Sequence, residues 1–203
     1  MAKLLIPIDD DAFKSEVSIR FNNILEGFDS FKNFTLMANS IESGENNFIK
    51  FIEYIFEINN CSAYVDFYIN KISDADKKKL LDLVPDEDKD ILKSHLSFDK
   101  HTGVFFKILN KDLIPFLVRL NTREIFFVTF YFTYKPISIW GNYNLNFPCF
   151  FNSQENLEFY YNISKSFELI SVLWIKTNKS MGSWMYYKHS ASHYFVYHFR
   201  LIT

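Results

Sequence analysis

In the first half of the chain, apolar side chains recur three or four positions apart, which is the spacing of one face of an α-helix. This spacing predicts helices over residues 13–25, 45–58, 74–84 and 85–96. Three consecutive aspartates, Asp9, Asp10 and Asp11, precede the first helix, and Gly27 is expected to end it. Ser73, followed three residues later by Asp76, indicates a capping box.

The second half of the chain shows the shorter, alternating apolar segments that are typical of strands. Strands are predicted over residues 104–109, 125–134, 137–140, 168–176, 184–188 and 194–201, after two earlier ones over 3–8 and 61–69. Short helices are expected over 112–120 and after Ser153. The segment 125–134 is apolar on both faces, so we expect it to be a central strand.

Helices therefore come first and strands accumulate later. This order predicts an α+β fold, in which a helix-rich N-terminal half packs on a mainly antiparallel β-sheet formed largely by the C-terminal half. No stretch rich in Gly, Ser or Pro separates the halves, so a single α+β domain over residues 1–203 is expected.

Composition adds an asymmetry to this picture. Of 203 residues, 48% are hydrophobic, which excludes a disordered chain. Residues 1–100 form an acidic helical half with a net charge of −7, and residues 101–203 form a basic, β-rich half with a net charge of +5. The basic half holds 26 of the 39 aromatic residues. The preference for Lys, Asn, Ile, Phe and Tyr indicates an A/T-rich genome, such as that of a low-GC bacterium, a mobile element or a phage.

The sequence favours a cytoplasmic location. The N-terminus lacks the pattern of a signal peptide, and the most apolar window is about ten residues long, too short to cross a membrane. The two cysteines, Cys61 and Cys149, belong to no CxxC pair and are expected to be buried thiols.

The first of two acidic motifs that could bind metal lies at residues 86–90. Asp86, Asp88 and Asp90 have the spacing that opens a calcium loop, but Ile91 and Ser97 stand where that loop requires Gly and Glu. The same acids are expected at the start of a helix, where they complement its dipole.

An alternative hypothesis is a metal-dependent hydrolase or nuclease that uses the cluster at residues 9–11, with His189 and His193 as further ligands. A helix cap and histidines in a turn or on the surface explain these residues better, so no metal or cofactor is predicted. No GxSxG, GxGxxG or P-loop motif is present, and no catalytic residue is assigned.

A third hypothesis is an RNA-binding domain that stacks bases on its aromatic side chains. The lysines and arginines of the basic half are dispersed, and the whole chain has a net charge of −2. Nucleic acid is therefore an unlikely partner.

The preferred hypothesis is a non-catalytic module that binds a basic protein, most concretely an immunity-type inhibitor of a toxin or effector enzyme. Acidic surfaces steer association with basic partners, and Trp and Tyr beside loops commonly anchor interfaces. The predicted contact residues are Asp82, Asp86, Glu87, Asp88, Asp90, Trp140, Tyr143, Trp184 and Tyr187.

Overall fold

The computed structural model describes the backbone of residues 4–97, 102–176, 183–190 and 193–200, and the side chains of residues 4–97 and 102–173. Within these residues, ten strands form one sheet in the order β1-β4-β3-β5-β6-β7-β2-β8-β9-β10. Every pair of neighbouring strands is antiparallel. The strands are β1 (Ile6–Pro7), β2 (Lys32–Met37), β3 (Ala63–Asp66), β4 (Phe105–Ile108), β5 (Thr129–Phe132), β6 (Ile137–Trp140), β7 (Asn146–Phe151), β8 (Ile170–Lys176), β9 (Ser183–Ser190) and β10 (His193–Arg200).

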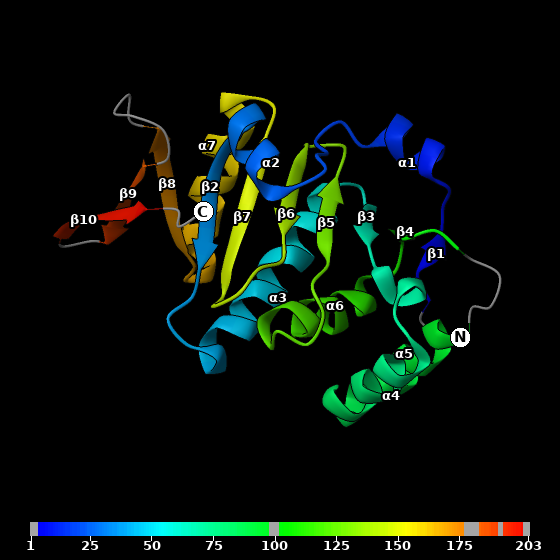
Figure 1. The fold of residues 1–203 in the computed structure, drawn as a ribbon. Helices are drawn as coiled ribbons and strands as arrows, with labels where there is room; N and C mark the ends of the chain where they lie inside the picture. The colour runs from blue at the N-terminus through cyan, green and yellow to red at the C-terminus, as the bar shows by residue number, and fades with distance from the viewer. Residues whose placement is uncertain (1–3, 98–101, 177–182, 191–192, 201–203) are drawn as a thin grey trace.

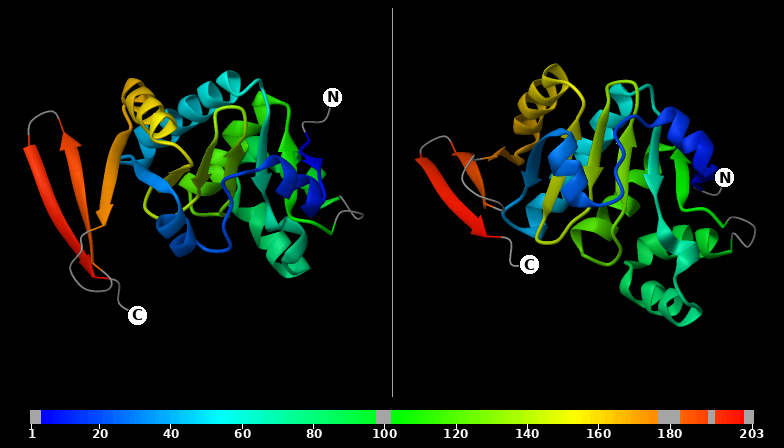
Figure 2. Two further views of the ribbon diagram at one scale, coloured as in Figure 1. Left: turned by 90° about the horizontal axis from the view of Figure 1, so that it is seen from above. Right: turned by 45° about the horizontal axis from the view of Figure 1, so that its top comes forward.

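Helices cover both faces of this sheet. They are α1 (Asp10–Glu16), α2 (Ile24–Ser30), α3 (Ile41–Ile58), α4 (Asp74–Leu83), α5 (Asp86–Leu96), α6 (Ile114–Thr122) and α7 (Gln154–Ser164), with short 3-10 turns η1 (Tyr68–Lys71), η2 (Lys111–Leu113) and η3 (Lys165–Phe167). The predicted α+β class is confirmed. α1 and α2 lie on the face seen in Figure 1, and α3 and α7 lie on the opposite face, as the views in Figure 2 show.

The main hydrophobic core lies between the sheet and the helices α3, α6 and α7, which cover one of its faces. α3 contributes the apolar stripe that its sequence spacing predicts, and Phe48, Ile52, Ile55 and Phe56 are buried in this core. Side chains of one strand point alternately to opposite faces of a sheet. Accordingly, the side chain of Phe130 enters this core, whereas that of its neighbour Tyr131 points to the other face.

A smaller apolar cluster lies on the α1 face. It consists of Phe13 and Val17 from the N-terminal segment, and Tyr64 and Tyr131 from adjacent strands. Phe13 stacks on Phe105, with ring centroids 3.7 Å apart. These contacts fasten α1 to the sheet.

The prediction of one helix over residues 13–25 is wrong. α1 ends at Glu16, and a new helix starts after Asn23, whose side-chain oxygen accepts a hydrogen bond from the Glu26 N–H at 3.1 Å. An asparagine that caps a helix in this way competes with helix continuation. Gly27 lies inside α2 instead of ending it, and a Cβ there would lie only 2.9 Å from the Phe21 ring.

Strands β2 and β7 have no counterpart among the predicted elements, although they pair with each other in the interior of the sheet. β7 contains Pro148, a residue that is normally confined to sheet edges because it lacks an N–H group. Pro148 lies opposite Thr35 in the ladder with β2, but the ladder with β6 covers only Cys149 and Phe150, so Pro148 lies just beyond the paired residues on that side.

The predicted strand over 125–134 is shorter than expected but is an interior strand, β5, between β3 and β6. The N–H groups of Ile125 and Phe126 both bond to the carbonyl of Leu120, so this segment first wraps the end of α6. Residues 177–182, which join the predicted strands over 168–176 and 184–188, lie outside the described residues.

No helix among the described residues combines the length and the apolar character needed to span a bilayer. Cys149 is buried as expected, but Cys61 is exposed, because it follows the end of α3 in a turn with a positive φ of 52°.

Candidate functional site

The predicted acidic surface maps to the helical hairpin α4–α5. Asp82, Asp86, Glu87 and Asp90 are exposed there. The prediction that Asp88 belongs to the contact surface is wrong, because Asp88 is only 1% exposed and cannot contact a partner. Its two carboxylate oxygens accept hydrogen bonds of 2.7 and 2.6 Å from the Arg119 guanidinium of α6. Asp88 therefore fixes the hairpin to the body of the protein.

Lysines offset much of the remaining charge of the hairpin. Lys89 pairs with Asp86 at 2.7 Å, and Lys93 pairs with Asp90 at 3.4 Å. The hydrogen bond from Lys89 lowers the pKa of Asp86. Residues 73–97 carry seven carboxylates and five lysines, a net charge of −2. The acidic surface is therefore weaker than its carboxylates alone suggest.

An apolar residue lies at the tip of the hairpin, among these acids. Leu83, the last residue of α4, is 63% exposed. In sequence it is flanked by Asp82 on one side and by Asp86 and Glu87, at the start of α5, on the other. The next residue, Val84, is buried, so the backbone at this tip is held against the core.

The predicted aromatic anchors do not form one surface with the hairpin. Trp140 of β6 is half-buried and stacks on Phe21, with centroids 5.4 Å apart. Tyr143 is 59% exposed and meets the edge of Phe127. Trp184 and Tyr187 lie in β9, which is separated from β6 by three strands of the sheet, and their side chains lie outside the described residues.

The aspartates that the alternative hypothesis assigned to a metal have ordinary roles in a helix. The Asp9 side chain caps α1 by accepting a hydrogen bond of 2.7 Å from the Ala12 N–H, and Asp10 and Asp11 are exposed in the first turn. No group of three potential metal ligands occurs among the described residues. The side chains of His189 and His193 lie outside the described residues.

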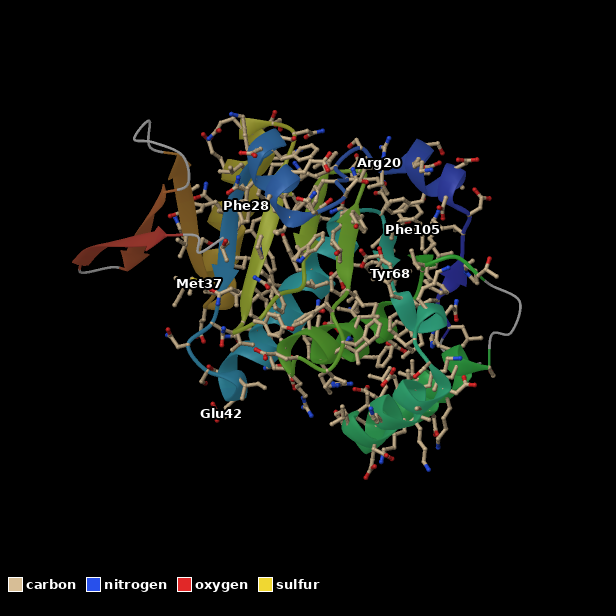
Figure 3. The ribbon with its side chains drawn as sticks, viewed as in Figure 1. Arg20, Phe28, Met37, Glu42, Tyr68 and Phe105 are labelled. Carbon is tan, nitrogen blue, oxygen red and sulfur yellow. The ribbon has the colours of Figure 1, made fainter. Side chains whose placement is uncertain are left out.

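A pocket that sequence reasoning missed lies on the α1–α2 face. Its volume is about 380 Å³. It is lined by residues of α1, of the segment joining α1 to α2, of α2, of η1 and of the sheet beneath: Phe13, Lys14, Arg20, Phe21, Asn22, Glu26, Asp66, Tyr68, Phe105, Tyr131 and Trp140. Figure 3 shows three of them, Arg20, Phe105 and Tyr68, close together beside α1.

Asp66, at the end of β3, supplies a buried carboxylate to this pocket; the residue is 8% exposed. It accepts hydrogen bonds from the Thr129 N–H at 2.5 Å and from the Tyr131 hydroxyl at 3.2 Å. Both donors are neutral, and no cationic side chain among the described residues pairs with it. Desolvation outweighs these bonds and the further hydrogen bonds from the Thr129 hydroxyl and the Asp66 N–H, and it raises the pKa of Asp66 to about 6.

The residues around this carboxylate are aromatic or polar. Tyr68 is 47% exposed, and burial together with the Asp66 charge raises the pKa of its hydroxyl. The stacked rings of Phe13 and Phe105 form one part of the lining, and those of Phe21 and Trp140 form another.

Two cationic side chains line the exposed part of the pocket. Arg20 is exposed and donates a hydrogen bond of 2.5 Å to the Val17 carbonyl. Lys14 is exposed and lies 3.8 Å from Asp11, whose side chain is almost entirely solvated. Glu26 is held by two donors of Asn22, its N–H at 2.9 Å and its side-chain amide at 3.0 Å.

One signal in the sequence marks this pocket. The predicted strand over 61–69 alternates, and Tyr64, Asp66 and Tyr68 share its more polar parity. A lone carboxylate between two tyrosines on an otherwise apolar strand is the sequence signal that indicates a candidate binding site here. The partners from α1 and β5 cannot be found in this way, because only folding brings them to the same face.

Comparison of this chain with family models, with curated proteins and with solved structures gives no match.

Proposed function

We propose that this chain is a non-catalytic module that binds a basic protein through the tip of the α4–α5 hairpin, and that it acts as an immunity-type inhibitor of a toxin or effector enzyme. The observation that carries this proposal is the exposed side chain of Leu83, placed between Asp82 on one side and Asp86 and Glu87 on the other.

This arrangement resembles the anatomy of a protein interface, in which an apolar centre is surrounded by a polar rim. The carboxylates of Asp82 and Glu87 remain exposed, and Glu87 lies 3.4 Å from Arg119 while its side chain is 63% exposed. Exposed acids accelerate encounter with a positively charged partner, and the apolar contact then slows dissociation.

The hairpin is also rigidly attached, which lowers the entropic cost of binding. Arg119 fixes the start of α5 through Asp88. Near the end of α5, the buried ring of His95 accepts a hydrogen bond of 2.9 Å from the Leu5 N–H. The tip is therefore presented by a helix pair that is held to the body near both ends of α5.

The test is co-expression with the product of the adjoining reading frame in the native genome. If that product arrests growth, this chain should relieve the arrest. The triple variant Asp82→Lys/Asp86→Lys/Glu87→Lys should lose most of this protection. The control variant Glu155→Lys/Glu158→Lys changes two exposed acids on α7 and should protect fully. An adjoining product without toxicity, or an arrest that the chain does not relieve, would contradict the proposal.

A further inference from the structure

We propose that the pocket on the α1–α2 face binds a small zwitterion, with a guanidinium group at Asp66 and an anionic group near Arg20 and Lys14. This site lies apart from the hairpin and does not depend on the function proposed for it. The ligand class is an arginine-like amino acid.

The inner end of the pocket lacks a positive charge. The Asp66 carboxylate is buried, and its hydrogen-bond donors are the neutral groups of Thr129 and Tyr131. A buried carboxylate is costly unless a cation pairs with it. The Thr129 hydroxyl and the Asp66 N–H also stabilise the carboxylate, and all of these donors are neutral, so the charge itself has no counter-ion among the described residues. The raised pKa of Asp66 is consistent with a site from which the counter-charge is missing.

The aromatic lining favours a planar cation. A guanidinium group stacks on aromatic faces and binds a carboxylate through two parallel N–H donors, whereas an ammonium group is a compact point charge. Tyr131 both donates to Asp66 and lines the pocket, and Phe13, Phe105 and Trp140 are near neighbours in the lining. A planar cation held by Asp66 therefore lies among rings.

The exposed part of the pocket supplies the opposite charge. Arg20 and Lys14 are exposed cations in the lining. Two acids lie near them: Asp11 is 3.8 Å from Lys14 and is almost entirely solvated, and one carboxylate oxygen of Glu26 accepts both donors of Asn22. An anionic group on the ligand pairs with these cations. The volume of about 380 Å³ lies in the range of small-molecule sites, roughly 300–1,000 Å³.

Isothermal titration calorimetry of the purified chain tests this site with L-arginine, agmatine and L-citrulline, each at up to about 10 mM, which covers millimolar affinities. Arginine should bind. Citrulline has a similar shape but carries no positive charge on its side chain, and it should bind at least about tenfold more weakly, because it leaves the Asp66 carboxylate without a cationic partner. Agmatine lacks the carboxylate and should also bind more weakly than arginine. Absence of arginine binding, or equal binding of arginine and citrulline, would overturn the proposal.

Two variants assign the ends of the ligand. Asp66→Asn keeps an oxygen to accept the Thr129 N–H, so the fold is expected to persist, and arginine binding should fall at least about tenfold. Arg20→Ala changes an exposed residue and should weaken arginine binding while leaving agmatine binding unchanged. Lys78→Ala, an exposed change on α4, is the control and should alter neither. Arginine binding that persists unchanged in Asp66→Asn, with thermal unfolding showing a folded protein, would overturn the site, as would an Arg20→Ala variant that binds both ligands as the wild type does.

Discussion

At Asp66, stability and ligand binding make opposite demands on one residue. Its carboxylate is buried with neutral partners, so the charged form destabilises the fold at neutral pH. A side chain that satisfies the Thr129 N–H without carrying a charge would serve the fold better. The presence of a carboxylate is therefore best explained by a role in binding.

The residue-scale prediction follows from the pKa of Asp66, which is 3.8 as a reference value and about 6 in the folded protein. Between these values the folded state holds the proton more tightly, so the contribution of Asp66 to stability falls as the pH rises through this window. We expect Asp66→Asn to stabilise the protein at pH 8 by on the order of 1–3 kcal/mol. The difference should shrink as the pH falls towards 4, as measured by urea denaturation at a series of pH values.

His95 has an effect of the opposite sign in the same pH range. Burial lowers its pKa, because its ring accepts the Leu5 N–H and lies in the core, so the stability it contributes is lost as the pH falls below about 6.5. The wild type and the Asp66→Asn variant both carry His95, so its contribution cancels in the difference between their free energies of unfolding. A wild type more stable than Asp66→Asn at pH 8 would show that Asp66 has a structural role.

At the scale of elements, helices with strong local signals were predictable. α4, α5 and α7 lie where apolar spacing and capping residues place them, and Ser73 accepts the Asp76 N–H at 3.1 Å as the capping box requires. α3 ends at Ile58 as predicted but begins at Ile41, four residues earlier than expected. β2 and β7 were not predictable. β7 contains a proline, and β2 begins with polar residues, so their assignment depends on pairing with each other far apart in the sequence.

The candidate site residues also divide into those that a local sequence pattern predicts and those that depend on tertiary contacts. The exposed carboxylates of the hairpin follow from a local pattern, but the burial of Asp88 depends on Arg119, 31 residues away. The pocket depends on still longer contacts, since Tyr131 lies 65 residues from Asp66. Sequence alone identifies most of the elements that carry these residues, but not the segment that joins α1 to α2, and the ion pair and the pocket arise from tertiary packing.

The element-scale prediction concerns the attachment of α5 to α6. Arg119→Ala leaves the Asp88 carboxylate buried without its partner, and we expect a loss of about 3–5 kcal/mol in the free energy of unfolding. Asp90→Ala removes an exposed pair with Lys93 on the same helix and should cost less than about 1 kcal/mol. Equal, small losses in urea denaturation at pH 7 would show that the Asp88–Arg119 pair does not fix the hairpin.

At the scale of the whole molecule, the acidic and basic halves of the sequence do not remain separate in space. β3 from the acidic half lies between β4 and β5, and β2 lies between β7 and β8. Strands from the acidic half and from the basic half of the sequence therefore alternate within one sheet. The two proposed recognition sites are local, one at the tip of the α4–α5 hairpin and one on the face that carries α1 and α2, and Figure 1 shows these helices in separate parts of the molecule.

The central claim is that the hairpin tip recognises a basic protein, and the rate of association tests it most directly. The measurement is stopped-flow binding to the toxin whose effect the chain relieves, at several salt concentrations. The wild-type rate should fall as salt screens the charges. Asp82→Lys/Asp86→Lys/Glu87→Lys should associate about tenfold more slowly at low salt, with a flatter salt dependence, while Glu155→Lys/Glu158→Lys should match the wild type. An unchanged rate and salt dependence in the triple variant would contradict the account.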